Sequence, residues 1–231
     1  MEERALHFSR VTAFEDKFDG ALNCVSANDH YDITDEGKII RIEESSLDSR
    51  SALNSETYKG FAKNMHARLL SAIGVSCWQL NQSESHAMWR VFGKSDHGIA
   101  IRSTLDGLAG SLTPGAYKLL VGRVRYIDYS SEKIPLDNHV EAFLYKSDHF
   151  KDERELRLLC YRSLKDHTGG ISFEPLPEAG LLLPVDLTRL VHGILVSPYA
   201  PAWFDALVRR TMDRHGLRVP VCLSEIRVRK A

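Results

Sequence analysis

Cysteine is scarce in this sequence, and the cysteines present are far apart. They are Cys24, Cys77, Cys160 and Cys222, and no two of them form a CxxC pair. A structural zinc site needs closely spaced ligand pairs, so this spacing argues against a zinc-binding module. The last three cysteines lie in apolar, strand-like runs. This predicts small buried hydrophobic residues in a reducing compartment.

Long apolar runs and an excess of charge of one sign are also missing. No stretch of about 18 apolar residues occurs, and the N-terminal MEERALHF lacks the apolar region of an export signal. We therefore expect a cytoplasmic protein without a membrane partner. The formal net charge is -1. Non-specific nucleic-acid binding requires an excess of Lys and Arg, so a protein dominated by that activity is not expected.

The common nucleotide-binding and hydrolase motifs are absent as well. The sequence contains no GxxxxGK[ST] or GxGxxG phosphate loop, no GxSxG elbow and no HExxH pair. An acid-x-Lys nuclease motif has one weak candidate, Glu36-Gly37-Lys38, in a polar stretch without a convincing strand.

What the sequence does contain is enough apolar residues for a large core. The chain has 231 residues, of which 43% are hydrophobic and 26% charged. Strand-like and helix-like segments are mixed without a βαβ period, a repeat or a linker. We predict a single α+β domain over residues 1–231, with a mixed or antiparallel β core flanked by helices. The polar segment Asn23–Ser49 is predicted to be a long loop or lid.

Apolar runs of strand length predict the core of this domain. The predicted core strands are Ser76–Leu80, Gly98–Thr104, Glu155–Tyr161 and Val191–Ser197. The alternating segment Val121–Tyr129 is predicted to be a further strand.

Helical spacing of apolar residues predicts the helices. They are Ser51–Ile73, Ser83–Phe92, Leu136–Lys146 and Pro201–His215. In the last of these, Trp203, Leu207 and Met212 are expected to face inward. Gly216 follows its end, as is typical of a helix stop.

Three segments place polar side chains beside aromatic ones, and together they resemble a known family. They contain Ser76-Cys77-Trp78 with Glu84 to Trp89, Gly98 to Thr104, and Lys146 to Arg157. In this order they resemble a bacterial family catalogued only as a domain of unknown function. Its pattern has a Ser-x-Trp/Ser strand, an acid before Met-Trp, a Gly-hydrophobic strand, then Lys, an aromatic residue and Glu-x-Glu-x-Arg. The resemblance spans roughly residues 5–226 and implies no particular activity. This chain departs from the pattern at Phe92, where the family usually has Tyr.

The charged run that ends at Arg157 is the densest part of this pattern. If a strand starts near Glu153, its period of two puts Glu153, Glu155 and Arg157 on one face, beside an apolar sheet. One interpretation is a structural ion pair of the kind that is common on strands. The other is that a glutamate serves chemistry while Arg157 holds its geometry.

Glu153 and Glu155 also resemble the Glu-x-Glu of one class of ADP-ribosyltransferases. That resemblance implies that Glu155 stabilises an oxocarbenium-like transition state and that Glu153 activates the acceptor. It implies NAD as substrate. Arg102 would bind the pyrophosphate, because a guanidinium matches phosphate oxygens, and Ser103 would belong to the Ser-Thr element beside it. In those enzymes the Arg and the Ser-Thr-Ser lie on different strands, whereas here they adjoin.

Three further residues complete the predicted NAD site. Trp89 is expected to stack on the nicotinamide or adenine ring, and Glu84 and Lys146 are expected to line the pocket. The alternatives are that Trp89 is core, that Glu84 only complements a helix dipole, and that Arg102 is an ordinary strand-end residue. We expect Glu84, Arg102, Lys146 and Glu155 to converge on one cleft beside Trp89.

The predicted function is therefore NAD-consuming ADP-ribosyl transfer, in a bacterial toxin or defence effector, with no metal. The acceptor macromolecule and the oligomeric state stay open. One alternative is a metal-dependent nuclease whose ligands would be drawn from Asp16, Glu84, Glu153 and Glu155. The other is a non-enzymatic sensor or binding module of a bacterial defence system.

Overall fold

The chain folds into two compact units, which are described separately. The computed structural model describes residues 3–14, 30–33, 39–42, 67–93, 97–132, 134, 140–165 and 171–227. Unit 1 comprises Met1–Leu6, Leu80–Gly115 and Leu182–Ala231, and unit 2 comprises His7–Gln79 and Ala116–Leu181. Within the described ranges, no helix has the length and apolar character needed to cross a membrane.

Unit 2 contains most of the strands. In chain order its described elements are β1 (Ala5–Arg10), η1 (Val11–Ala13), β2 (His30–Ile33), β3 (Ile39–Ile42), a helical segment at residues 67–72, β4 (Gly74–Gln79), β6 (Lys118–Arg123), β7 (Arg125–Ile127), η3 (Glu141–Leu144), β8 (Tyr145–Ser147), η4 (Asp148–Glu153), β9 (Glu155–Tyr161), β10 (Ser163–Lys165), β11 (Ile171–Phe173) and β12 (Leu181–Pro184). The boundary with unit 1 falls within β1 and β12.

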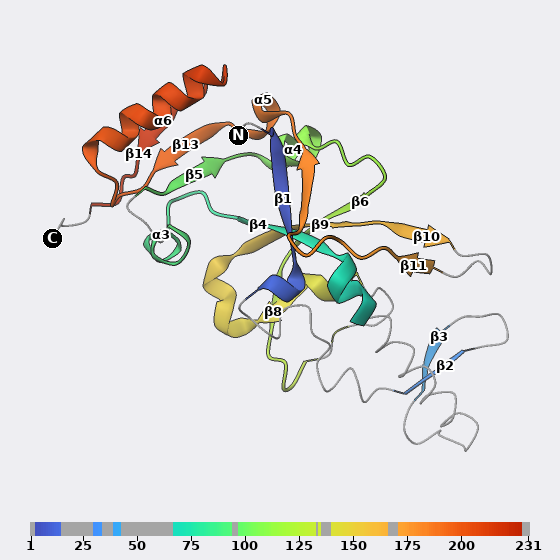
Figure 1. Cartoon of the computed structure of the whole chain (residues 1–231). Coiled ribbons are helices and arrows are strands. Elements are labelled where there is room, and N and C mark those ends of the chain that lie inside the picture. The colour runs from blue at the N-terminus through green and yellow to red at the C-terminus, as the bar shows by residue number, and fades with distance from the viewer. Residues whose placement is uncertain are drawn as a thin grey trace. The chain divides into compact units, whose positions relative to one another are not determined.

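The main sheet has the strand order β12-β1-β4-β9-β6, shown in Figure 1. The pairs β1–β4, β4–β9 and β9–β6 are antiparallel. Three ribbons of two strands accompany it: β2–β3, β10–β11 and the parallel pair β7–β8. Antiparallel and mixed sheets combined with helices confirm the predicted α+β class.

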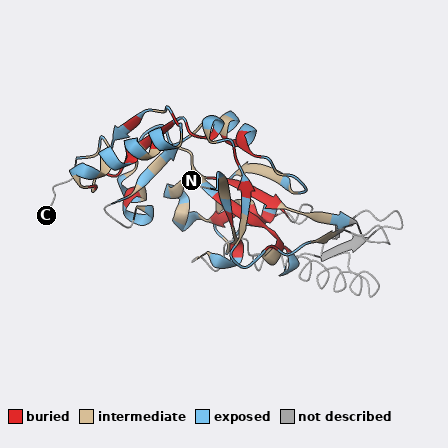
Figure 2. Cartoon of the chain, turned by 45° about the horizontal axis from the view of Figure 1, so that its top comes forward, coloured by how far each residue is buried: buried red, intermediate tan, exposed pale blue. Residues whose placement is uncertain are grey.

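Strand β9 lies at the heart of this sheet. Six of its seven residues, all except Tyr161, are buried, and Figure 2 draws such residues in red. A strand paired on both sides and covered on both faces needs an almost continuous apolar run, and LRLLC supplies one with Arg157 as its single interruption. The prediction for Glu155–Tyr161 is therefore confirmed as a strand, and both of its faces are buried.

The core beneath this sheet joins segments that are distant in sequence. Buried Leu69 and Ile73, from the helical segment and the residue after it, pack with Val75 of β4, Leu159 of β9 and Phe143 of η3. Cys160, on the other face of β9, is fully buried, and burial raises the pKa of its thiol to about 12. This thiol therefore stays protonated and unreactive at neutral pH.

Gly74 begins β4 at a point where three elements approach it closely. A Cβ at this position would lie 2.8 Å from Cys160 Sγ, 2.9 Å from Leu176 Cδ1 and 3.0 Å from Phe8 Cβ. All three neighbours are fixed in the core. We therefore expect Gly74→Ala to lower the free energy of unfolding by about 1–3 kcal/mol, the usual cost of overpacking, as measured by urea denaturation.

Gly110 provides the matched control for this substitution. A Cβ at Gly110 would meet only the flexible guanidinium of Arg189, at 3.8 Å or more. Gly110→Ala should therefore leave stability unchanged or raise it by up to about 1 kcal/mol, since Ala favours helices over Gly. Equal losses in the two variants would contradict the close packing described for Gly74.

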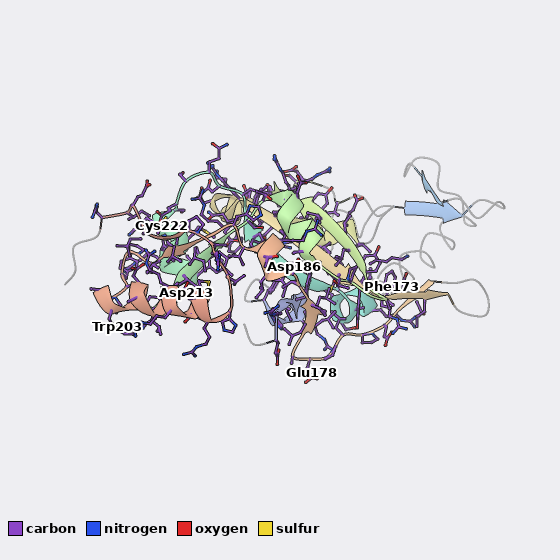
Figure 3. The ribbon with its side chains drawn as sticks, turned by 90° about the horizontal axis from the view of Figure 1, so that it is seen from above. Phe173, Glu178, Asp186, Trp203, Asp213 and Cys222 are labelled. Atoms are coloured by element: carbon purple, nitrogen blue, oxygen red, sulfur yellow. The ribbon has the colours of Figure 1, made fainter. Side chains whose placement is uncertain are left out.

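Unit 1 has a smaller, mixed sheet with four helices. Its described elements are α3 (His86–Phe92), β5 (Ile99–Arg102), α4 (Leu105–Ser111), α5 (Leu187–Leu190), β13 (Gly193–Val196), α6 (Ala202–Arg214) and β14 (Val221–Leu223). The strand order is β14-β13-β5, with β13 parallel to β14 and antiparallel to β5. Side-chain caps begin three of the helices: Ser85 for α3, Thr104 for α4 and Asp186, labelled in Figure 3, for α5.

Helix α6 was predicted correctly in extent but not in orientation. It begins after Pro201 and ends before Gly216, whose φ of 70° lets the chain leave the helix. Met212 is buried as expected, but Trp203 (labelled in Figure 3) and Leu207 are 57% and 48% exposed. The apolar residues of α6 spread over more of its circumference than the fold buries. The helix buries the side that carries Val208 and Met212.

All four predicted core strands form strands, but β5 is not buried, and in the predicted segment Ser76–Leu80 only Ser76 is buried. Its residues Ile99 and Ile101 are 37% and 39% exposed because β5 is an edge strand of the described three-stranded sheet. The prediction of a buried strand at Gly98–Thr104 is wrong in this respect. An apolar run shows that a strand can be buried but does not show which strand has a neighbour on each side.

Two further predictions of secondary structure were correct only in part, and residues 136–139 of the second lie outside the described residues. The segment predicted as one strand over Val121–Tyr129 is divided between β6 and β7, because the chain changes partner from β9 to β8 at Val124. The segment predicted as a helix over Leu136–Lys146 contains the 3-10 helix η3 and then enters β8. Ladder bonds to β7 override the helical pattern there.

The prediction for the cysteines holds only in part. Cys160 is buried, whereas Cys77 and Cys222 (labelled in Figure 3) are exposed. Alternating strand positions face opposite ways, so a location in an apolar run did not decide burial. Cys24, Asp16 and most of the predicted lid Asn23–Ser49 lie outside the described residues, and the prediction of a single domain stays a prediction.

Candidate functional site

Four charged side chains meet inside unit 2. The Lys146 ammonium lies 2.5 Å from Glu153 Oε2 and 3.9 Å from Glu155 Oε2. Arg157 donates to the same Glu155 oxygen from Nε at 2.9 Å and from Nη2 at 2.7 Å. Two cations and two carboxylates therefore form one compact cluster, which we call the Lys146 cluster.

Arg157 is the deepest member of the cluster. Its side chain is 0% exposed, and its Nη1 donates to the carbonyl oxygen of Phe143 at 2.9 Å. Its guanidinium lies 5.9 Å from the ring centroid of Phe14. A buried cation needs such partners, because leaving water costs several kcal/mol per ion. Arg157 therefore holds Glu155 in a fixed position.

Glu153 reaches the cluster by a route that the sequence did not suggest. It ends η4 instead of starting a strand, and Arg154 then adopts a left-handed conformation with φ 45°. Strand β9 begins only at Glu155. The predicted single row of Glu153, Glu155 and Arg157 is wrong for Glu153, while Glu155 and Arg157 do share a face. The turn at Arg154 brings Glu153 back over the strand end.

Lys146 links the two carboxylates. Its side chain is 8% exposed, and its ammonium lies 4.6 Å from the ring centroid of Phe150, a cation–π distance. The side chain of Glu153 is 18% exposed and that of Glu155 only 9%. Glu153 is thus the carboxylate closer to solvent, and Glu155 lies below it.

Tyr126 belongs to this site, although no sequence motif indicated it. Its hydroxyl accepts a hydrogen bond from the backbone N–H of Glu155 at 2.8 Å. In the β7–β8 ribbon Tyr126 pairs with Lys146, so the two side chains leave the ribbon on the same side. Burial raises the pKa of Tyr126, and the charges of Glu155 and Glu153 raise it further. The phenol therefore stays protonated and can donate its own proton to a ligand.

Glu84 and Trp89 lie in unit 1, where they make a structural contact. Trp89 is buried and donates from Nε1 to Glu84 Oε2 at 2.9 Å. The carboxylate of Glu84 also accepts from Ser224 Oγ at 2.5 Å and from the backbone N–H of Glu225 at 2.8 Å. Glu84 precedes the helix cap Ser85, so it fastens the segment after β14 to the start of α3. These partners fit the alternative in which Trp89 is core.

The hydrogen bonds to Glu84 have a consequence that depends on pH. Burial by itself raises the pKa of Glu84, but the bonds from Ser224, Glu225 and Trp89, with the charge of Arg102, outweigh it and lower the pKa. A carboxylate with a depressed pKa stabilises the fold above its unfolded pKa of about 4.3. That contribution is lost as the pH falls through the folded pKa.

We therefore expect Glu84→Gln to lower the melting temperature at pH 7, with a difference from wild type that shrinks below about pH 4. Melting curves of both proteins between pH 3 and pH 7 would show this. Glu178→Gln, at an exposed turn (Figure 3), should match wild type throughout. A Glu84→Gln deficit that stayed constant to pH 3 would contradict a role for the ionised carboxylate.

Arg102 and Ser103 also lie in unit 1, at the end of β5. Arg102 is exposed, and its side chain lies over Gly193, where an added Cβ would be 3.9 Å from Arg102 Cβ and Cδ. Ser103 Oγ donates to the carbonyl of Thr104, 3.3 Å away. Their predicted roles toward NAD stay predictions. The predicted shared cleft also stays untested, since Lys146 and the Glu-x-Glu pair belong to unit 2.

Among the described residues, no three or more His, Cys, Asp or Glu side chains form a group that could hold a metal ion. Asp16, one of the ligands suggested for the nuclease alternative, lies outside the described residues.

Comparison with known proteins gave no match among protein-family models, curated proteins or solved structures. The resemblances noted in the sequence therefore stay predictions, and the geometry of the Lys146 cluster is the observation from which a function can be proposed.

Proposed function

We propose that the Lys146 cluster is the active site of an enzyme that cleaves the nicotinamide–ribose bond of NAD and transfers the ADP-ribose. The observation that supports this is the convergence of two carboxylates on one ammonium, with Glu153 toward solvent and Glu155 fixed beneath it. A simple structural ion pair needs neither the second carboxylate nor the second cation. Burying four charges costs free energy through desolvation, and attraction between them repays that cost only where the geometry is good.

The chemistry matches these side chains. When the bond between ribose C1′ and the nicotinamide nitrogen breaks, its electron pair leaves with nicotinamide and positive charge develops on the ribose. A carboxylate held in place by Arg157 stabilises that charge without reorganising during the reaction. Glu155 has this role. Glu153, closer to solvent, accepts the proton of the acceptor hydroxyl as its oxygen bonds to C1′.

A direct assay tests the proposal. The purified protein is incubated with NAD, and free nicotinamide is measured by chromatography with and without EDTA. We expect nicotinamide release that EDTA does not change, with ADP-ribose on water or on a protein acceptor as the second product. Loss of all activity in EDTA would favour the metal-dependent alternative. No release at protein concentrations close to those of NAD would refute the proposal.

A non-enzymatic role is the second candidate, and one observation favours it. Arg157 donates from Nε and Nη2 to a single oxygen of Glu155 and from Nη1 to the Phe143 carbonyl. An arginine with a purely structural role would make the same bonds. In that case the cluster fixes η3 and η4 against β9, and the protein is a binding module. The variants described in the Discussion separate the two candidates.

A further inference from the structure

A hollow lies in unit 2 beside strand β6. It has a volume of about 590 Å³ and is lined by consecutive residues from Leu120 to Arg125 together with Glu141, Leu144 and Tyr145. The size lies in the range of sites for small organic ligands. β6 ends the described order of the main sheet, so the hollow follows an edge strand.

The lining combines an apolar floor with two cations and one carboxylate, that of Glu141, so its formal charge is positive. Leu120, Val124 and Leu144 supply apolar surface, and Arg123 and Arg125 supply guanidinium groups. Both arginines line the same hollow, so both guanidiniums can reach one bound group. The hollow therefore suits an anion attached to an apolar body.

Arg123 and Arg125 differ in how firmly the fold holds their side chains. Arg125 donates from Nη1 to the Tyr145 hydroxyl at 3.1 Å and lies 5.7 Å from that ring centroid, so its position is fixed. Arg123 is exposed, and its side chain has no hydrogen bond or ion pair within the described ranges. Its charge is free to meet a ligand.

This hollow is distinct from the Lys146 cluster. In the parallel β7–β8 ribbon, Arg125 pairs with Tyr145 and Tyr126 pairs with Lys146. Neighbouring residues of a strand face opposite sides. Arg125 and Tyr145 therefore face the hollow, while Tyr126 and Lys146 face the cluster.

We propose that the hollow is a binding site for a nucleoside monophosphate, with its phosphate on Arg123 and Arg125 and its base or sugar on the apolar floor. Two guanidinium forks match the several oxygens of a phosphate better than the two of a carboxylate. The floor favours a flat organic group over inorganic phosphate alone. This inference is independent of the chemistry at the Lys146 cluster.

Calorimetric titration with AMP tests the proposal. We expect saturable binding with a dissociation constant below about 1 mM, little binding of adenosine, and weaker binding of inorganic phosphate. Arg123→Ala should weaken AMP at least ~10-fold, the scale of one lost hydrogen bond to a charged group. Because Arg123 is exposed, the variant should keep the wild-type melting temperature.

Two matched variants serve as controls. Arg210→Ala removes an exposed arginine of α6 in unit 1 and should leave AMP affinity unchanged. Glu155→Gln alters the Lys146 cluster and should change it less than twofold. No AMP binding at millimolar concentration, or equal binding by wild type and Arg123→Ala, would overturn the site. Inorganic phosphate binding as tightly as AMP would overturn the nucleoside part.

Discussion

Glu155→Gln is expected to reduce nicotinamide release from NAD by at least ~100-fold, the scale of losing one electrostatic stabiliser. The amide keeps the shape of the side chain, and its oxygen can still accept from Arg157 Nε and Nη2. The negative charge that would meet the cationic ribose is lost. Since that charge matters most in the transition state, the affinity for NAD should fall only slightly.

Glu155→Gln is also expected to change the stability of the protein, so its activity has to be compared with its free energy of unfolding. Losing the charge of Glu155 weakens the pairing of a fully buried arginine, so we expect a loss of about 1–3 kcal/mol in the free energy of unfolding. Turnover per folded molecule is therefore measured well below both melting temperatures. Glu178→Gln, the same chemical change at an exposed turn, should keep both properties. A destabilised Glu155→Gln protein with wild-type specific activity would remove Glu155 from the catalytic residues and favour the non-enzymatic candidate.

Arg157→Ala is expected to lower the free energy of unfolding by about 3–5 kcal/mol, the usual result of removing one partner of a buried ion pair. The side chain is 0% exposed, and its loss leaves a cavity, removes the hydrogen bond to the Phe143 carbonyl and removes the arginine that holds the Glu155 carboxylate beside Lys146. Urea denaturation of wild type and variant measures the difference. This result is expected whether or not the cluster is catalytic.

A surface pair gives the matched control. Arg162 and Glu174 form an ion pair with a separation of 3.0 Å, but their side chains are 39% and 45% exposed. Arg162→Ala should therefore cost no more than about 1 kcal/mol. A double variant, Arg157→Ala with Glu155→Gln, should lose less than the sum of the two single losses, because the residues are coupled. Equal costs for Arg157→Ala and Arg162→Ala would show that burial does not determine the importance of this pair.

Local patterns were good guides wherever a segment's own residues decide its structure. The apolar run in Glu155–Tyr161 predicted β9, and the proline and glycine at the ends of the Pro201–His215 segment predicted α6. The helix predicted over Ser83–Phe92 forms as α3, although it begins three residues later, after its cap Ser85. Where packing decides, the same patterns failed, as for Trp203 on α6.

The candidate site could be predicted only in part, for a geometric reason. Lys146, Glu153 and Glu155 stood out because they are close in sequence, and they do meet. Tyr126 is 29 residues from Glu155 and contacts its backbone N–H, a relation that no spacing rule encodes. Glu84 and Trp89 were recognised as notable but assigned to NAD, whereas they contact each other and the chain after β14.

The sequence by itself therefore determined the α+β class, the strands β4, β5, β9 and β13, and the chemical types gathered near Glu155. Hydrophobic periodicity and helix-end residues are local properties that survive in any arrangement of the elements. Only the tertiary structure decided that Arg157 is fully buried, that the chain turns at Arg154 to return Glu153 to Lys146, and that Arg125 and Tyr126 face opposite sides of one ribbon. These features depend on which strands become neighbours, and pairing energies between distant segments determine that choice.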